Sequence, residues 1–278
     1  MDNKSLAIMI IIVVILTLPI LALTYVNSLQ PDLYPIIPAP TPGTPHAAGP
    51  FPAAYAYNWA GYALTGPTGW VSQVKGNWTV PTYTGASCNP YEWWDSSFWI
   101  GMDGFNSNTV EQTGTETGCF KGLVYYDAWY EFYPSSSVII SHTIYPKDNM
   151  SAEVNYVSGV FIVSIQDTTS GHKWSFTTTA TVSGVKRSSA EWIAESPIGG
   201  ALPLGILPLA DFGTAHFIGG TAVTTTHSGT IGSFPNPKIQ AITAVCFPSN
   251  TPNKATPTAL SKTGANFNVT WVNPGPQG

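Results

Sequence analysis

The sequence predicts an all-β protein, a sandwich or barrel of antiparallel sheet, and three observations carry this prediction. Short runs of β-branched and aromatic residues recur between clusters of Gly, Pro, Asn and Ser, as in proteins built from many short strands. No long window shows the 3.6-residue periodicity of an amphipathic helix. The 278 residues include 26 Gly and 24 Pro but only 9% charged residues, a composition that excludes a helical bundle or coiled coil.

The chain begins with a hydrophobic segment that is long enough to cross a bilayer as a helix. Residues 6–26 carry no charge, Lys4 lies just before them, and the next charged residue is Asp32. This order of charges directs the following chain outward. Residues 1–28 are therefore expected to be a signal peptide or an N-terminal membrane anchor, and both alternatives export the rest of the chain. A buried globular helix is the least favoured interpretation.

A proline-rich stretch separates this hydrophobic helix from the rest of the chain. Residues 29–54 include the run P-D-L-Y-P-I-I-P-A-P-T-P-G-T-P. So much proline favours an extended, semi-rigid backbone over packed structure. A linker is the preferred interpretation, and a short propeptide is the alternative.

The remaining residues, 55–274, are expected to form one domain, since no internal repeat divides them. Phe161, Val163 and Ile165 recur at every second position and should share one face of a strand. The runs that predict strands are Gly76–Pro81, Phe98–Met102, Val124–Tyr133, Val138–Tyr145, Val154–Gln166, Lys173–Val182, Glu191–Ala194 and Ile239–Cys246, with a last strand within Thr263–Val272.

Charge and cysteine content exclude several kinds of partner and site. The net charge is −5 and Arg187 is the single arginine, so the basic surface of a nucleic-acid-binding protein is missing. Cys88, Cys119 and Cys246 allow one disulfide in an oxidising compartment, and spacing alone leaves the pairing open. No CxxC motif occurs and the five histidines are scattered, so no metal site is expected. A phosphate-binding glycine loop does not occur either, so no cofactor is expected.

Carboxylates interleaved with Trp and Tyr are the remaining chemical signal. The motifs of serine hydrolases and zinc peptidases do not occur, and neither does the Asp-Thr-Gly or Asp-Ser-Gly triplet of pepsin-like enzymes. Acidic and aromatic residues alternate instead in Tyr126–Pro134 and Ala190–Glu195. This pattern predicts an acidic groove lined by aromatic residues. The alternative is that the aromatic residues pack the strands while acids such as Asp127 and Glu131 point to solvent.

Several of these segments resemble the glutamic peptidases, the eqolisin family of secreted acid proteases first known from fungi. A single short motif would mean little, but here a series occurs in the family's order. The matching motifs are Asn58-Trp-Ala-Gly61, Trp78-Thr-Val-Pro81, Trp99-Ile-Gly101 with Asp103, Gln112-Thr-Gly114, Tyr126-Asp-Ala-Trp-Tyr-Glu131, Tyr133-Pro134, Ala190-Glu-Trp-Ile193 with Glu195, and Ala210-Asp-Phe-Gly213.

The resemblance implies a sandwich of two packed antiparallel sheets and a catalytic glutamine–glutamate pair. The glutamine corresponds to Gln112 and the glutamate to Glu195, the second glutamate of its motif. Glu191 is the reserve candidate, because a spacing of four places it on the same side of a regular strand. The residues expected to line the substrate cleft are Trp59, Trp99, Asp103, Glu116, Asp127 and Trp129, with core packing as the alternative for Trp59 and Trp99.

The resemblance further implies an acid endopeptidase that is pepstatin-insensitive and works without a cofactor or metal. Glu195 would activate a water by taking its proton, while Gln112 would orient the water and stabilise the oxyanion. The expected protein is an extracellular or surface-tethered monomer that acts on polypeptides and binds a membrane only if residues 6–26 are retained. The alternatives are a non-catalytic β-sandwich that binds polysaccharide or protein through an aromatic groove, and an acid glycosidase with two carboxylates.

Composition also leads to an expectation about stability. The chain has only fifteen carboxylates whose protonation could destabilise the folded state. When they are neutral in acid, the 10 Lys and Arg residues and 5 His residues give a modest positive charge, which limits self-repulsion. Folding stability is therefore expected to change little between neutral pH and about pH 3.

Overall fold

The structure is a computed structural model that describes residues 53–85, 88, 91–199, 205–246 and 252–275. The expected signal or anchor segment, 1–28, lies outside these ranges, as does the linker 29–54 except for its last two residues. Among the described residues, no helix is long and apolar enough to span a membrane.

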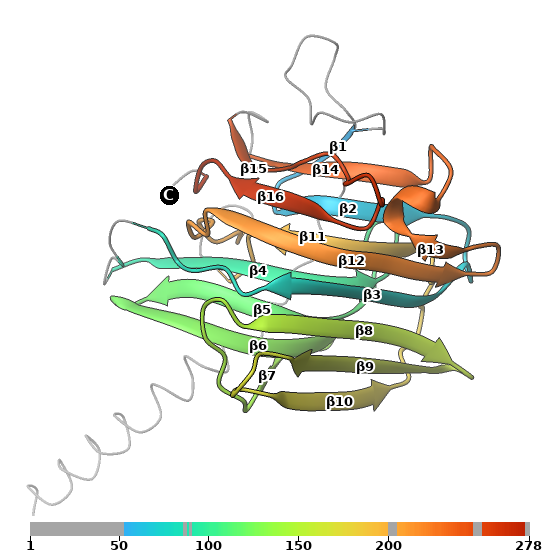
Figure 1. The fold of residues 1–278 in the computed structure, drawn as a ribbon, viewed down its shortest axis with the longest axis horizontal. Helices are drawn as coiled ribbons and strands as arrows, with labels where there is room; N and C mark the ends of the chain where they lie inside the picture. Colours follow the sequence, from blue (N-terminus) through green and yellow to red (C-terminus); the bar gives the residue numbers. More distant parts are fainter. Residues whose placement is uncertain (1–52, 86–87, 89–90, 200–204, 247–251, 276–278) are drawn as a thin grey trace, which may run out of the picture. The chain divides into compact units, whose positions relative to one another are not determined.

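The described chain is built almost entirely of strands, which Figure 1 labels in order. The first eight are β1 (Ala53–Ala56), β2 (Trp59–Thr65), β3 (Val71–Thr79), β4 (Trp93–Met102), β5 (Val110–Phe120), β6 (Leu123–Tyr133), β7 (Val138–Ile140) and β8 (Asn149–Val157). The others are β9 (Val160–Asp167), β10 (Trp174–Ala180), β11 (Ser189–Glu195), β12 (Thr214–Thr224), β13 (Ser228–Thr230), β14 (Ile239–Val245), β15 (Asn253–Pro257) and β16 (Phe267–Trp271). A short 3₁₀ turn, η1 (Ile231–Ser233), follows β13.

One continuous path of hydrogen-bonded strands folds back on itself to make two layers. The order along the path is β10-β9-β8-β3-β12-β16-β15-β14-β2-β11-β4-β5-β6-β7, with β1 beside β14 and β13 beside β12. Strands β3, β8 and β12 of one layer contact β4 and β11 of the other (Figure 1). This confirms the predicted all-β sandwich. The pairing is antiparallel throughout the described strands except between β1 and β14, which are parallel.

One predicted strand is in fact a hairpin. The run Val154–Gln166 is divided into β8 and β9, because Ser158 and Gly159 adopt positive φ values of 50° and 90°. Two such residues form the tight turn that suits the twist of a hairpin. The alternation at Phe161, Val163 and Ile165 within β9 is confirmed, since all three side chains are buried.

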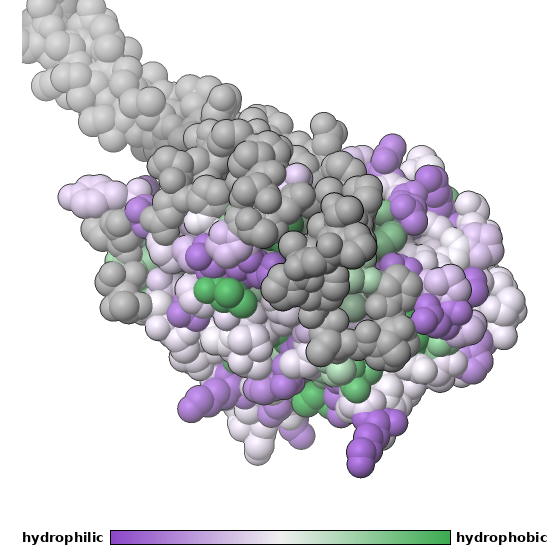
Figure 2. All heavy atoms as spheres, turned by 90° about the horizontal axis from the view of Figure 1, so that it is seen from above, coloured by the Kyte–Doolittle hydropathy of each residue, from purple (hydrophilic) through white to green (hydrophobic). Residues whose placement is uncertain are grey.

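The space between the layers is filled by apolar and aromatic side chains, and two of the buried indole groups form hydrogen bonds across it. Trp78 donates its indole N–H to Thr115 Oγ1 at 2.9 Å, and Trp192 donates to the backbone oxygen of Lys75 at 2.7 Å. Both bonds join the two layers and satisfy buried indole groups. On the described part of the face in Figure 2, hydrophobic residues lie in small separate groups.

A disulfide joins Cys88 to Cys119. It connects the segment before β4 to the end of β5, so it closes the same pair of strands that carries part of the predicted site. Cys246 is buried and carries a free thiol. The structure therefore settles the pairing that spacing left open.

Candidate active site

Adjacent strands of one layer place the predicted site residues in rows across a single face. Glu195 of β11 lies opposite Trp59 of β2 and Ser97 of β4. Ser97 in turn lies opposite Glu116 of β5, which lies opposite Asp127 of β6. Residues that pair directly across strands point to the same side of a sheet. This row therefore crosses the strands in the order β2, β11, β4, β5, β6.

Gln112 belongs to the same face, two rows further along the strands. It lies opposite Gly101 of β4, whereas Glu195 lies opposite Ser97 of that strand. Trp99 occupies the position between Ser97 and Gly101 and points the same way, because side chains alternate along a strand. Gln112 and Glu195 thus face the same side from β5 and β11, with Trp99 between them.

The indole rings around these polar groups pack against one another. Trp59 and Trp99 meet edge to face with ring centres 5.0 Å apart, and both rings are buried. Gly114 lies between Trp99 and Trp129 in the sheet, and a Cβ there would come within 2.6 Å of the Trp99 Cβ. Trp129 also donates its N–H to Ser97 Oγ at 3.1 Å. The rings are packed as in a core, but the N–H groups of Trp99 and Trp129 bond to polar groups of the site.

Two donors orient the carboxyl group of Glu195. Asn58 Nδ2 donates to Oε1 at 3.0 Å, and Trp99 Nε1 donates to Oε2 at 2.7 Å. Burial raises the pKa of Glu195 to about 7, although these hydrogen bonds oppose the increase by favouring the ionised form. The side chain can therefore exchange a proton between acid and neutral pH.

A buried lysine lies behind this carboxyl group. Lys254 of β15 is 3% exposed, and its Nζ donates to Ser196 Oγ at 2.7 Å and to the backbone oxygen of Tyr57 at 3.3 Å. Burial lowers the pKa of Lys254 to about 8. Its positive charge lowers the pKa of Glu195 and so tunes the group that the sequence predicts to be catalytic.

The amide nitrogen of Gln112 makes a side-chain hydrogen bond, whereas its amide oxygen makes none with the described residues. Its Nε2 donates to Glu131 Oε2 at 2.5 Å, while Oε1 is buried and has no hydrogen-bond partner among the described residues. Burial raises the pKa of Glu131 to about 8, with the hydrogen bond from Gln112 lowering it and the charge of Glu195 raising it. The amide oxygen is thus available as an acceptor.

Further carboxyl groups belong to the same electrostatic cluster. Burial raises the pKa of Asp95 to about 7 and raises that of Asp127. The pKa of Glu116 is raised well above its ordinary value by burial and then by the charges of Asp95 and Asp127. Like charges at close range disfavour simultaneous ionisation. Low pH therefore favours the neutral form of these carboxyl groups.

The structure does not bring Asp103 together with these residues, although the sequence predicts it in the cleft. Asp103 is fully buried, and its carboxylate accepts backbone N–H groups of Lys186, Arg187 and Ser188 at 2.8, 2.6 and 2.8 Å. Its hydrogen-bonding capacity is used to hold that loop before β11. Glu191, the reserve candidate, is also fully buried, and burial raises its pKa well above the ordinary value.

Four polar residues of the site are not among the site residues predicted from the sequence. Asn58 and Glu131 lie within matching motifs, so the motifs could have indicated them. Asp95 and Lys254 carry no such signal, because only folding brings them to Glu195.

Comparison with known proteins confirms the resemblance. The profile of the Peptidase A4 family matches residues 57–269. Aspergillopepsin-2 from Aspergillus niger is 30% identical over 197 residues, which cover 64% of this chain and 67% of that protein. A scytalido-glutamic peptidase structure superposes with a TM-score of 0.61 at 24% identity, covering 78% of this chain and 98% of the other. Aspergilloglutamic peptidase from Aspergillus niger superposes with a TM-score of 0.52 at 24% identity, over 64% and 99%.

The structural matches establish a shared fold, and the profile match extends over most of the chain. Together with the ordered motifs, they identify the protein as a hydrolase of peptide bonds that belongs to the Peptidase A4 family of glutamic peptidases.

Proposed function

We propose that this protein is an exported acid endopeptidase in which Glu195 and Gln112 perform the chemistry. One observation carries the proposal: a single sheet face presents a carboxyl group oriented by two donors and an amide whose oxygen is unpaired among the described residues. A scytalido-glutamic peptidase of the same fold has been solved with a peptide-based transition-state analogue, which supports polypeptide substrates. The Cys88–Cys119 disulfide supports an oxidising, extracellular setting for a monomer exported by residues 1–28.

In the proposed reaction, a water held by the Gln112 oxygen attacks the scissile carbonyl carbon. The Glu195 carboxyl takes the water's proton on one oxygen while its other oxygen gives its proton to the nitrogen of the scissile bond, and collapse of the resulting oxyanion breaks the C–N bond to release the amine. The carboxyl group therefore ends the step protonated, as it began. The second N–H of the Gln112 amide, the one not donated to Glu131, would stabilise the negative charge that develops on the carbonyl oxygen. No charge change is required of Gln112, since its amide does not titrate.

The surrounding acids are the reason why acid conditions suit this site. Asp95, Glu116 and Glu131 have raised pKa values, so low pH keeps them neutral. A neutral cluster leaves Glu195 protonated and presents little negative charge to an incoming peptide. Rising pH ionises the cluster one group at a time. The proposed enzyme should therefore lose activity as pH rises through neutrality.

Digestion of a peptide library by the full chain tests this function. We expect internal cleavage at about pH 2–5, unaffected by pepstatin, because no aspartate pair takes part. Mass spectrometry of the products identifies the cut bonds, and a parallel incubation with glycans measures glycosidase activity. Inhibition by pepstatin would contradict the glutamate mechanism. A well-folded protein that binds polysaccharide without cleaving any peptide would instead favour the non-catalytic sandwich.

Replacing Lys254 with methionine should move the pH dependence of peptide cleavage upward. Loss of the positive charge raises the pKa of Glu195, since that charge favours the ionised form. If protonated Glu195 begins the reaction, activity then persists to higher pH. The profile of kcat/KM against pH measures the shift. Lys75→Met is the matched control, because Lys75 forms a surface ion pair with Glu153. An unchanged or lowered alkaline limb in Lys254→Met would contradict the proposed role.

A further inference from the structure

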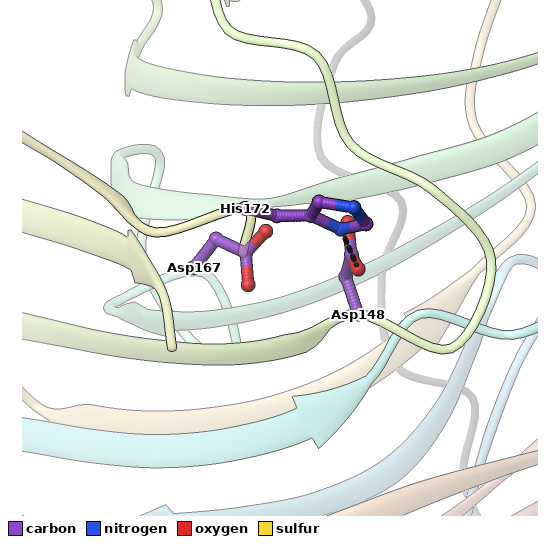
Figure 3. Close-up of side chains that lie close together, drawn as sticks. All are labelled: Asp148, Asp167 and His172. Atoms are coloured by element: carbon purple, nitrogen blue, oxygen red, sulfur yellow. Dashed lines mark hydrogen bonds and ion pairs between the residues drawn. The ribbon is translucent and has the colours of Figure 1, made fainter. Parts of the chain in front are cut away.

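Three potential metal ligands meet at one end of the layer formed by β8, β9 and β10. Asp148 immediately precedes β8, Asp167 ends β9, and His172 lies in the turn between β9 and β10. One ligand atom from each side chain lies within 4.8 Å of the others. The three side chains converge in Figure 3, where the Asp167 carboxylate points toward the other two. None of these residues belongs to the proposed peptidase site.

Each aspartate is held by the backbone through one of its oxygens. Asp148 Oδ2 accepts the backbone N–H of Tyr145 at 2.7 Å, and Asp167 Oδ1 accepts that of Thr169 at 2.8 Å. Both side chains are almost completely buried, at 2% exposure. Such carboxylates are fixed in direction before any ligand arrives, which is the condition for a preorganised site.

The remaining oxygens are where a cation would be bound. Asp148 Oδ1 lies 2.9 Å from His172 Nδ1, so these two form a pair. Asp167 Oδ2, in contrast, is buried and has no hydrogen-bond partner among the described residues. A buried carboxylate oxygen without a partner is unfavourable. An ion pair between Asp148 and His172 provides partners for the polar atoms of those two side chains, but it provides none for Asp167 Oδ2.

We propose that Asp148, Asp167 and His172 bind a divalent transition-metal ion, with Zn²⁺ as the best match. One imidazole and two carboxylates form a donor set suited to Zn²⁺, whereas Mg²⁺ and Ca²⁺ prefer oxygen ligands throughout. Ligand atoms at about 2.1 Å in a tetrahedral arrangement lie roughly 3.4 Å apart. Asp148 Oδ1 and His172 Nδ1 are therefore slightly too close at 2.9 Å, and Asp167 must approach, since the three ligand atoms lie within 4.8 Å of one another. The side chain of His172 is 43% exposed and can make this adjustment.

Bound metal would join three segments that meet at this end of the layer. It would connect the loop before β8, the end of β9 and the turn that leads to β10, the last strand of the hydrogen-bonded path. Because the ion would bind the folded chain, it should stabilise it in proportion to its affinity and concentration. The proposed role is structural and does not depend on peptidase activity.

Isothermal titration calorimetry of the full chain with ZnCl₂ at about pH 7 tests the site. We expect one Zn²⁺ per chain and an increase in the thermal unfolding midpoint, with little response to MgCl₂. Asp167→Asn and His172→Gln should each weaken binding by at least about tenfold. His216→Gln, which removes another exposed histidine that bonds to Asn268, should bind normally.

The variants separate metal binding from folding. Circular dichroism shows whether Asp167→Asn is folded, and the exposed His172→Gln provides an independent variant if it is not. Co²⁺ substitution adds a spectroscopic signal, because d–d absorption reports ligand geometry without any activity measurement. Failure of the wild type to bind Zn²⁺, undiminished binding by a folded Asp167→Asn and His172→Gln, or equal binding of Mg²⁺ would each overturn the proposal.

Discussion

Glu195→Gln is expected to lower kcat for peptide hydrolysis by about 10²- to 10⁴-fold. Glutamine keeps the shape of the side chain. Its single oxygen can still accept the Trp99 N–H, and its NH₂ can donate to Asn58 Oδ1 once the Asn58 amide turns over. It cannot, however, exchange a proton with the attacking water. Folding should be preserved, since the substitution also removes a buried group that can ionise. Initial rates on a single peptide substrate, at saturation and at low concentration, measure kcat and kcat/KM separately.

Two further variants determine whether the correct pair has been chosen. Gln112→Ala should lower kcat by about 10²- to 10³-fold, the usual effect of losing an oxyanion donor. Glu191→Gln is the matched control for Glu195→Gln, because Glu191 lies on the same strand but is fully enclosed. It should retain most of the activity. Loss of activity in Glu191→Gln alone, with Glu195→Gln active, would show that the catalytic acid had been misassigned.

The free energy of unfolding is expected to be highest in acid and to decrease as pH rises above about 4.5. Burial raises the pKa of Glu111 from an ordinary value of 4.5 to about 9 and raises that of Glu191 well above 4.5. Both groups are fully buried. Above about pH 4.5 they stay protonated in the folded protein and ionise in the unfolded chain, so the folded state binds more protons. Unfolding then becomes easier as pH rises, until the folded-state pKa is reached.

This expectation replaces the one drawn from composition, which predicts nearly constant stability between neutral pH and about pH 3. Counting carboxyl groups ignores their burial, and burial determines the sign of the effect. Each such group lowers the unfolding free energy by about 1.4 kcal/mol per pH unit within its window. Several buried carboxyl groups together make the dependence steep. A protein with these buried groups should be less stable at neutral pH than in acid.

Denaturant unfolding at a series of pH values measures this dependence directly. Glu111→Gln should flatten the decrease by about 1.4 kcal/mol per pH unit between about pH 5 and 8, because it removes one ionising group. Glu153→Gln is the control, since Glu153 is partly exposed and pairs with Lys75 at the surface. Its slope should match the wild type. A wild-type stability that is flat or rises with pH would show that these carboxyl groups are not held neutral in the fold.

The strands that the sequence predicts are those that contain a run of aromatic residues or an alternation of apolar and polar residues. β6 is predicted from its run of Tyr, Trp and Phe, and β9 from alternating buried residues. β5, which carries Gln112, is not predicted, because V-E-Q-T-G-T-E-T-G is polar and rich in glycine. Its glycines make sense only in the sheet: Gly114 leaves room for Trp99 and Gly118 for Tyr125.

The amino-acid sequence by itself determined the fold class and the family, because short strands and ordered motifs are local properties of the chain. Only the tertiary structure decided which residues meet. In the folded protein, Asp103 binds the backbone of the loop before β11, and Lys254 lies close enough to Glu195 to lower its pKa. Asp148, Asp167 and His172 lie close together, although the histidines are scattered along the sequence. The pKa values were decided there too, since burial and neighbouring charges arise from contacts between distant segments. Such contacts depend on strand register and layer packing, which no local pattern specifies.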